Sequence, residues 1–190
     1  TLYVFGGSVD GFSTNILQKF SFSIYRSVME IEKEIVDKKQ KFGVPPPRSK
    51  HGCAVVNSNI YVFGGLCERR EASFVNQNKK LVYNDLYVYD TDKALWTEIE
   101  VNGVSPPPLY GFTMTAVNHF IYIYGGFNEH DEIQSHIYRF DTKNLTWSVI
   151  LVRGASWPST SSPTDYQLPC ALHGAVEIGG NRIAIIGGVH

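Results

Sequence analysis

The sequence predicts an all-β protein made of repeated units, and three observations lead to this prediction. A Gly-Gly pair occurs four times, each time after a run of β-branched and aromatic residues. The second glycines stand at positions 7, 65, 126 and 188, so the spacings are 58, 61 and 62 residues. The composition suits strands and turns, since 13% of the residues are aromatic and the chain holds 17 glycines and 9 prolines. Such a period is typical of a repeat array, which presents loops on a scaffold.

The charge and hydropathy of the chain exclude two classes of partner. The formal net charge is -1, which gives no general attraction to nucleic acid or to an anionic membrane. The longest apolar runs have about six residues, whereas a membrane-spanning helix needs about 20. We therefore expect no nucleic-acid partner and no membrane span.

The cysteines indicate the compartment. The chain contains Cys53, Cys67 and Cys170, and it has no Cys-x-x-Cys pair. An odd number argues against a disulfide framework, and the lack of paired spacing argues against structural zinc. We expect a reducing environment and therefore a cytoplasmic protein.

Two units superpose when the sequence is shifted by 61 residues. At this shift 45–47 matches 106–108 and 60–65 matches 121–126; further along the units, and no longer at the same shift, Tyr89 matches Phe140 and Trp96 matches Trp147. Each unit then holds four strand candidates separated by turn residues, and the second strand ends at the glycine pair. The other expected ranges are 52–56, 113–117 and 174–178 for the first strand, 85–89 and 136–140 for the third, and 95–99 and 146–151 for the fourth.

The first unit matches the others poorly from residue 18 to residue 40. By the 61-residue shift, Val28 stands at the position of the aromatic residue and Ile35 at that of the tryptophan. The segment 27–36, SVMEIEKEIV, contains both helical and strand periodicity. We predict a strand there, with a short helix as the alternative.

Four antiparallel strands repeated at this period form the blades of a β-propeller. A single sheet of this size cannot bury both faces, and packing against the next blade buries them. The glycine pair lets the backbone adopt positive φ and approach closely where a strand ends. The tryptophan is expected to be a large apolar anchor between blades. The predicted structural residues are Gly6, Gly7, Gly64, Gly65, Gly125, Gly126, Gly187, Gly188, Trp96 and Trp147.

These residues resemble the kelch repeat, in which apolar residues and a double glycine are followed by a spaced aromatic residue and a tryptophan. The resemblance covers nearly the whole chain and is strongest in the units that end at Trp96 and Trp147. Arg48 and His51, like the run 172–174, also resemble the segment that leads into a kelch first strand. The resemblance implies a kelch-type β-propeller with about three consecutive four-stranded blades.

We expect residues 1–190 to be part of one propeller domain that forms an incomplete ring. The expected blade segments are roughly 1–44, 45–104, 105–167 and 168–190, with three, four, four and two strands. Propellers usually need four to eight blades. We therefore expect further blades of the same longer chain before Thr1, after His190 or both, and a dimer of half-rings is the alternative.

Antiparallel alternation sorts the loops onto two faces. The links from second to third strand and from fourth to first strand emerge on one face, and the hairpins emerge on the other. The long links are Ser8–Lys19, Leu66–Asn84, Phe127–Ser135 and Val152–Pro169. Long loops on a rigid scaffold are where binding usually occurs, and the resemblance implies that this face binds a peptide or a protein.

The first candidate binding residues lie in the link 66–84. Its basic side chains could bind an acidic partner, and Phe74 could be an apolar anchor. The basic residues are Arg69, Arg70, Lys79 and Lys80. The alternative is a solvated loop in which Glu68 and Glu71 neutralise the arginines.

Two other links carry further candidates. In 127–135 these are Asn128 and His130, and an acidic run with one histidine lacks metal-ligand spacing, so a solvated turn is favoured over a metal site. In 152–169, Trp157 and Tyr166 could be hot spots for a partner, or the segment could be a flexible insertion with phosphorylatable serines.

The favoured function is a non-catalytic scaffold for protein–protein interaction, as a regulatory or adaptor subunit without a cofactor. The sequence contains no Walker loop, dinucleotide fingerprint, Gly-x-Ser-x-Gly elbow or His-Glu-x-x-His motif. Because kelch-like folds also form copper oxidases and sugar isomerases, an enzyme is the alternative. A propeller appended to a phosphatase or to a ubiquitin-ligase subunit is another, since fold alone does not decide function.

Overall fold

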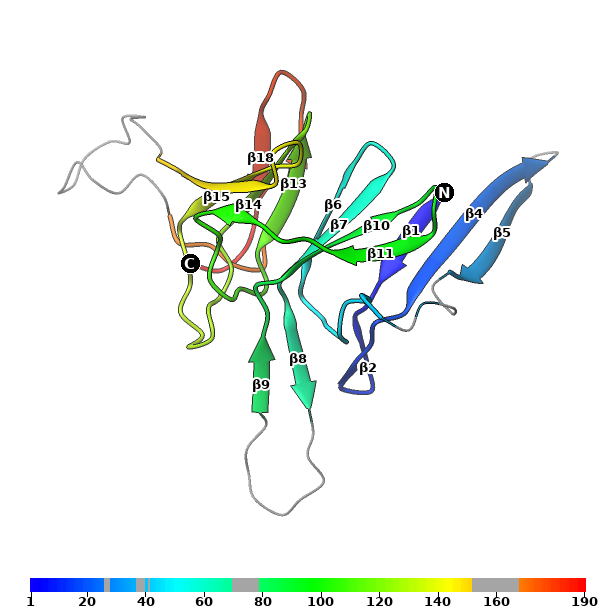
Figure 1. The fold of residues 1–190 in the computed structure, drawn as a ribbon, viewed down its shortest axis with the longest axis horizontal. Helices are drawn as coiled ribbons and strands as arrows, with labels where there is room; N and C mark the ends of the chain where they lie inside the picture. The colour runs from blue at the N-terminus through cyan, green and yellow to red at the C-terminus, as the bar shows by residue number, and fades with distance from the viewer. Residues whose placement is uncertain (26–27, 37–39, 41, 70–78, 152–167) are drawn as a thin grey trace, which may run out of the picture.

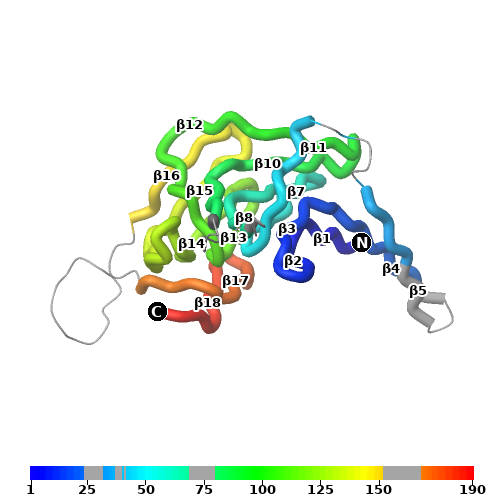
Figure 2. Tube along the Cα trace, turned by 90° about the horizontal axis from the view of Figure 1, so that it is seen from below, coloured from blue at the N-terminus to red at the C-terminus, as the bar shows by residue number. Residues whose placement is uncertain are grey.

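The computed structural model describes residues 1–25, 28–36, 40, 42–69, 79–151 and 168–190. Within these ranges the regular structure consists of β-strands, without a helix, as the sequence predicts. The strands form four main sheets that follow one another in sequence order along an open arc (Figures 1 and 2). We call these sheets blades 1 to 4.

Among the described residues, the blades contain three, four, five and two strands. Blade 1 is β1 (Leu2–Phe5), β4 (Leu17–Tyr25) and β5 (Val28–Ile35). Blade 2 is β6 (Gly52–Val56), β7 (Asn59–Phe63), β10 (Leu86–Asp90) and β11 (Leu95–Glu98). Blade 3 is β13 (Thr113–Val117), β14 (Phe120–Tyr124), β15 (Ile137–Asp141) and β16 (Thr146–Ile150), with β12 (Asn102–Gly103) at its outer edge. Blade 4 is β17 (Gly174–Glu177) and β18 (Ile183–Ile186).

Two short hairpins lie outside the blades. They are β2 (Ser8–Val9) with β3 (Phe12–Ser13), and β8 (Leu66–Arg69) with β9 (Lys79–Val82). Both belong to links between a second and a third strand, and both project from the same side of the arc (Figure 1). The links therefore carry local structure of their own.

The outer part of blade 1 confirms one prediction and corrects another. The segment predicted as a strand with a helix as the alternative is β5. However, the register places Phe20 opposite Lys33, as it places Tyr89 opposite Trp96, so Val28 and Ile35 are not the equivalents of the aromatic residue and the tryptophan. The fixed shift fails because the preceding link is short: β4 already begins at Leu17. The Lys33 ammonium lies 5.9 Å from the centre of the Phe20 ring, in place of an indole.

The glycine pairs are the corners at which one blade meets the next. Every glycine of the four pairs has positive φ, between 60° and 100°. The N–H of the second glycine donates to a carbonyl oxygen of the following blade's lead-in segment, at 2.8 to 2.9 Å. These bonds are Gly7 to Arg48, Gly65 to Leu109 and Gly126 to Cys170. A Cβ on the first glycine would lie 2.0 to 2.8 Å from the same oxygens, so no side chain fits there.

Each corner also holds a ring from the next blade. His51 lies edge-on to Phe5, Phe112 to Phe63, and His173 to Tyr124, with ring centres 5.2 to 5.8 Å apart. The three rings occupy equivalent positions, because a Cβ on the first glycine of the preceding pair would lie 3.0 to 3.2 Å from each of them. A phenylalanine in the same position as two histidines indicates that this position requires a ring for packing.

The tryptophans anchor the blade interfaces. Trp96 contacts Phe5 of the preceding blade at 4.9 Å and Tyr89 of its own blade at 5.1 Å between ring centres. Trp147 repeats this arrangement with Phe63 at 5.3 Å and Phe140 at 4.9 Å. One hydrophobic cluster fills the interface of blades 1 and 2, and a larger one fills that of blades 2 and 3. The core is therefore divided between interfaces.

The outer edges of blades 2 and 3 are covered in part by neighbouring chain. On blade 2, the amide of Gln40 donates to the carbonyl oxygen of Trp96 and accepts its N–H, each at 2.8 Å. On blade 3, β12 pairs in parallel with β16. A Cβ on Gly103 would lie 2.2 Å from the Trp147 carbonyl oxygen, so this close pairing needs glycine.

Replacement of Trp96 by alanine is expected to lower the free energy of unfolding by about 3–5 kcal/mol, because it removes a buried indole from a blade interface. The measurement is chemical denaturation followed by circular dichroism. The matched control is Leu95→Ala, at the neighbouring exposed position, with a change within about 0.5 kcal/mol. A loss below this value for Trp96→Ala would contradict the anchor role.

Acid is expected to destabilise the chain partly through His51. Burial, with a smaller contribution from the Arg48 guanidinium, lowers the pKa of His51 to about 4. The unfolded chain, in which the histidine pKa is about 6.5, therefore binds a proton in a range where the folded chain does not. The contribution of His51 to the free energy of unfolding is fully present above pH 6.5 and is lost as the pH falls toward 4.

The variant His51→Phe tests this contribution, because Phe112 fills the equivalent position of blade 3. Between pH 7 and pH 5 the wild-type chain should lose about 2 kcal/mol more than the variant, measured by urea denaturation. Parallel stability profiles of the two proteins would exclude His51 as the source.

Candidate partner-binding face

The links between second and third strands gather on one side of the arc, which we call the loop face. In Figure 1 the β2–β3 hairpin, the β8–β9 hairpin and the link after β14 all project downward from the blades. The hairpins β6–β7 and β17–β18 turn on the opposite side. This is the arrangement that antiparallel alternation predicts.

The β8–β9 hairpin carries Arg69, Lys79 and Lys80, three basic residues of the link 66–84. Its ladder runs from Leu66 opposite Val82 to Arg69 opposite Lys79, and Glu68 lies opposite Lys80. An unlike pair of charges directly across a ladder is favourable. The pairing therefore fixes the place of Lys80 on the loop face.

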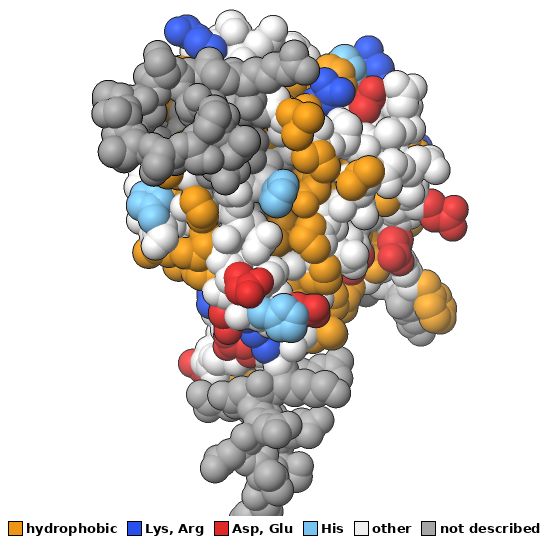
Figure 3. All heavy atoms as spheres, turned by 90° about the vertical axis from the view of Figure 1, so that its left-hand side faces the viewer, with side chains coloured by type: hydrophobic (Ala, Val, Ile, Leu, Met, Phe, Trp, Pro, Cys, Tyr) orange, Lys and Arg blue, Asp and Glu red, His pale blue; other side chains and the backbone are white. Residues whose placement is uncertain are grey.

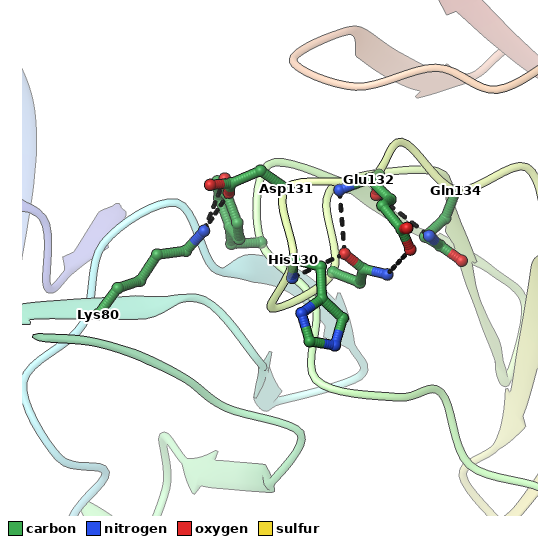
Figure 4. A network of polar contacts seen from close by, with 7 residues as sticks. Lys80, His130, Asp131, Glu132 and Gln134 are labelled. Atoms are coloured by element: carbon green, nitrogen blue, oxygen red, sulfur yellow. Dashed lines mark hydrogen bonds and ion pairs between the residues drawn. The ribbon is translucent and has the colours of Figure 1, made fainter.

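Lys80 meets the neighbouring link of blade 3 in a polar cluster (Figure 4). Its ammonium donates to the Tyr110 hydroxyl at 3.0 Å and also to a carboxylate oxygen of Asp131. The Tyr110 hydroxyl donates to the same Asp131 oxygen. We call Lys80, Tyr110 and Asp131 the loop-face triad, and it joins a hairpin of blade 2 to a turn of blade 3.

The turn that presents Asp131 is organised by Asn128. The Asn128 side-chain oxygen accepts the N–H groups of His130 and Glu132 at 2.9 and 3.0 Å, and its amide donates to the Glu132 carboxylate at 2.7 Å. Asp131 adopts a φ of 62°, which aspartate tolerates better than most residues. Asn128 therefore shapes the loop, while His130 points away from the triad (Figure 4).

Tyr110 is the fixed centre of the triad. Its buried ring stacks on Phe127 with centres 5.2 Å apart and an angle of 23°, and the two residues exchange backbone hydrogen bonds at 2.8 and 3.0 Å. The Lys80 ammonium lies 4.2 Å from the ring centre and the Lys50 ammonium 5.6 Å, both within cation–π range. Two ammonium groups therefore lie within cation–π distance of the Tyr110 ring.

The charges of the triad reinforce one another. Hydrogen bonds from Lys80 and Tyr110 lower the pKa of Asp131. Partial burial opposes the charged form of Lys80, but its contacts with Asp131 and Tyr110 outweigh this effect and raise the Lys80 pKa. The ammonium and the carboxylate are therefore both charged over the whole neutral range.

Beneath the loop face lies a buried ion pair. The Arg48 guanidinium, with no exposed surface, donates to both Asp85 carboxylate oxygens at 2.6 and 2.9 Å and to the Gly64 carbonyl oxygen at 2.9 Å. Its central carbon lies 4.5 Å from the ring centre of Tyr83. This pair ties the lead-in segment of blade 2 to the start of β10.

The structure describes only part of the predicted binding set. Lys80, Asn128 and His130 lie on the loop face, and only Lys80 belongs to the triad. The residues Arg70, Phe74, Trp157 and Tyr166 lie outside the described ranges, and Arg69 and Lys79 are described through their backbone alone. Tyr110 was not among the residues predicted from the sequence. The 61-residue shift aligns it with Ser49, and this difference between the two units was the signal that could have identified it.

The described residues contain no group of three or more His, Cys, Asp or Glu side chains that could hold a metal ion. The described part of the chain also has no helix capable of crossing a membrane.

A second candidate site is a cavity of about 720 Å³ between blades 3 and 4. Tyr122, Tyr124, Ile183 and Ile185 are among its lining residues. In blade 3 the equivalents of these two isoleucines pack with Phe140 and Trp147, whereas the blade 4 sheet has two strands. The cavity thus occupies the place that outer strands fill in blade 3.

Hydrophobic surface is exposed at both ends of the arc. Leu2 and Val4 of β1 are 51% and 43% exposed, whereas their equivalents in blade 2, Ile60 and Val62, are 3% and 0% exposed. At the other end, the exposed hydrophobic residues are Val176, Ile185, Ile186 and Val189. Figure 3 shows a band of hydrophobic side chains on the side of the molecule at the left of Figure 1.

The repeated sheets, their glycine corners and the clustered links define a propeller-type repeat protein. A family model described as "KLHDC2/KLHL20/DRC7 Kelch-repeats domain" matches residues 1–188. The chain therefore belongs to the kelch-repeat family, and its fold is that of kelch β-propeller blades.

Curated relatives show where similar segments occur. The chain is 35% identical over 113 residues to N-(sulfonatooxy)prop-2-enimidothioate sulfolyase of Thlaspi arvense, covering 58% of this chain and 30% of the relative. It is 30% identical over 109 residues to the dynein alpha chain, flagellar outer arm, of Chlamydomonas reinhardtii, covering 56% and 2%. It is 24% identical over 171 residues to Kelch domain-containing protein 3 of Homo sapiens, covering 86% and 42%. The chain spans less than half the length of each of these relatives.

The two members of the Arg48–Asp85 pair are expected to differ in their contribution to stability. Asp85→Ala leaves a fully buried guanidinium without its carboxylate, so the free energy of unfolding should fall by about 3–5 kcal/mol. Arg48→Leu leaves a carboxylate that is 20% exposed, and leucine occupies the equivalent position 109, so the loss should be about 1–3 kcal/mol. Urea denaturation measures both, and a larger loss for Arg48→Leu would contradict this description.

Proposed function

We propose that the chain is a non-catalytic kelch scaffold that binds another protein through its loop face, as a regulatory or adaptor subunit. The observation that carries this proposal is the loop-face triad, in which two links from different blades place charged and aromatic groups together on a rigid support. Binding residues commonly lie on loops held by a rigid scaffold. Kelch-family membership supports protein interaction as the general role.

The proposed partner presents an acidic segment. Lys50 and Lys80 both lie beside the Tyr110 ring, and the β8–β9 hairpin adds the basic residues Arg69 and Lys79 at its end. Ammonium and guanidinium groups form strong charge-assisted hydrogen bonds with carboxylates. The remaining residues of the proposed binding set are Arg70, Phe74, Asn128, His130, Trp157 and Tyr166.

The proposed context is a larger propeller in which the blade segments 1–44, 45–104, 105–167 and 168–190 belong to one domain. Positions that are buried in blade 2 are exposed at Leu2 and Val4, and the cavity beside blade 4 has the place of two outer strands. Both features support further blades of the same longer chain as the groups that cover these surfaces.

A cytoplasmic location is also part of the proposal. The three cysteines are free in the structure, and Cys67 and Cys170 are buried. Unpaired thiols suit a reducing compartment, where disulfides seldom form.

A second candidate is a propeller that forms, or is attached to, an enzyme. The observation in its favour is the similarity to a relative named as a sulfolyase. Similarity to a short part of a much longer dynein chain further supports attachment to other domains. We favour the scaffold because the loop-face triad places charged and aromatic groups on a rigid support, an arrangement suited to binding a partner.

The test is affinity capture from an extract with the wild-type chain and a variant in which Arg69, Arg70, Lys79 and Lys80 are alanine. Recovery of specific partners should fall at least about tenfold in quantitative mass spectrometry, as expected when charged contacts at an interface are lost. The control variant replaces basic residues of the opposite face, Lys93, Lys143 and Arg182, by alanine. Equal recovery with the two variants would contradict the proposed binding face.

A further inference from the structure

The loop-face triad has the donor arrangement of a carboxylate-binding site. An ammonium from Lys80 and a hydroxyl from Tyr110 lie 3.0 Å apart, and both donate to one oxygen of Asp131. The donors belong to the β8–β9 hairpin and to the lead-in segment of blade 3, whereas the acceptor belongs to the link after β14. Charge-assisted hydrogen bonds of this kind are among the stronger polar contacts in proteins.

The two donors are held in place independently of Asp131. Tyr110 is buried, stacks on Phe127 and exchanges two backbone hydrogen bonds with it. Lys80 lies within the β8–β9 ladder, opposite Glu68, and its ammonium sits over the Tyr110 ring. Removal of the Asp131 carboxylate therefore leaves both donors where they are.

The Asp131 carboxylate can move away from the site more easily than the Lys80 and Tyr110 donors can. The Asp131 side chain is 66% exposed, and the hydrogen bonds that shape its turn are made by Asn128 and by backbone groups. Because no bond within the turn depends on the Asp131 carboxylate, the carboxylate can leave without unfolding the loop. Exposed ion pairs also contribute little to stability, so the contact opens at low cost.

We propose that Asp131 is an internal occupant of a binding site for an acidic side chain, and that a Glu or Asp of the partner binds Lys80 and Tyr110 by displacing it. This inference rests on the proposed function and adds that Asp131 regulates binding of the partner. The partner carboxylate takes over the donors that Asp131 releases, so the exchange leaves no cation unpaired. Lys50, beside the same ring, provides a second positive charge for a segment with more than one acidic residue.

Competition of this kind has a measurable consequence. When an occupant fills a site for most of the time, the apparent affinity of a ligand equals its intrinsic affinity multiplied by the fraction of time for which the site is free. If Asp131 fills the site about four-fifths of the time, its removal should increase the affinity about fivefold. The increase should require Lys80 and should disappear at high salt, which screens exposed charges.

The probe is a fluorescein-labelled dodecapeptide with four glutamates, alternating with glycine and serine, and with an amidated C-terminus. A second peptide carries glutamine at the same four positions. Fluorescence anisotropy measures the Kd for the wild-type chain, Asp131→Asn, Lys80→Met and the double variant. Glu129→Gln is the matched control, because it makes the same change of charge in the same turn without touching the donors.

Asp131→Asn should bind the glutamate peptide about fivefold more tightly than the wild-type chain does, whereas Glu129→Gln should leave the Kd unchanged. Lys80→Met should abolish the gain in the double variant, and none of the proteins should bind the glutamine peptide. Thermal unfolding midpoints within about 2 °C of the wild-type value would show that the fold is retained.

Other results would separate the regulation from the binding face itself. An unchanged Kd for Asp131→Asn, with weaker binding for Lys80→Met, would overturn the occupant role and leave the proposed function standing. Equal gains from Asp131→Asn and Glu129→Gln would assign the effect to net charge and overturn the inference. Absence of binding by every variant would overturn the carboxylate site, while the capture experiment would still decide whether the loop face binds partners.

Discussion

The contact on which the rest of the structure depends is the meeting of each glycine pair with the next blade. One glycine accommodates a carbonyl oxygen where a Cβ would collide, and the next donates its N–H to that oxygen. The same corner accepts a ring, either histidine or phenylalanine, from the following blade. Backbone geometry thus sets the angle between neighbouring sheets, and side chains fill the remaining space.

This division of roles explains how the loop face can vary while the blades remain similar. The corner needs a backbone oxygen and no particular side chain, so Arg48, Leu109 and Cys170 all occupy the equivalent position. Arg48 uses this freedom to form a buried ion pair with Asp85, which blade 3 lacks. The links that begin beyond the corners are likewise free to differ, and in one of them the turn at Asp131 reaches the hairpin of the preceding blade.

Most of the fold could be predicted because short sequence patterns that recur in each unit determine it. The glycine pairs, the strand patterns and the tryptophans identify the blades, and the structure confirms the strands expected from them. The register of blade 1 could not be obtained from a fixed shift, because a shorter link and a longer hairpin compensate in length and hide the change. The loop-face triad was also beyond sequence analysis as a unit, since it joins residues separated by 21 to 51 positions through the packing of two blades.

The covering of Trp96 by Gln40, and of β16 by β12, limits how copies of this molecule can associate. A free sheet edge would offer hydrogen-bonding groups to any extended peptide or to another sheet, which is a common route to aggregation. Here the backbone groups of Trp96 and of Thr146–Trp147, at the outer edges of the two middle blades, already bond to the chain's own groups. Productive recognition is thereby directed to surfaces where side chains, and not bare backbone, select the partner.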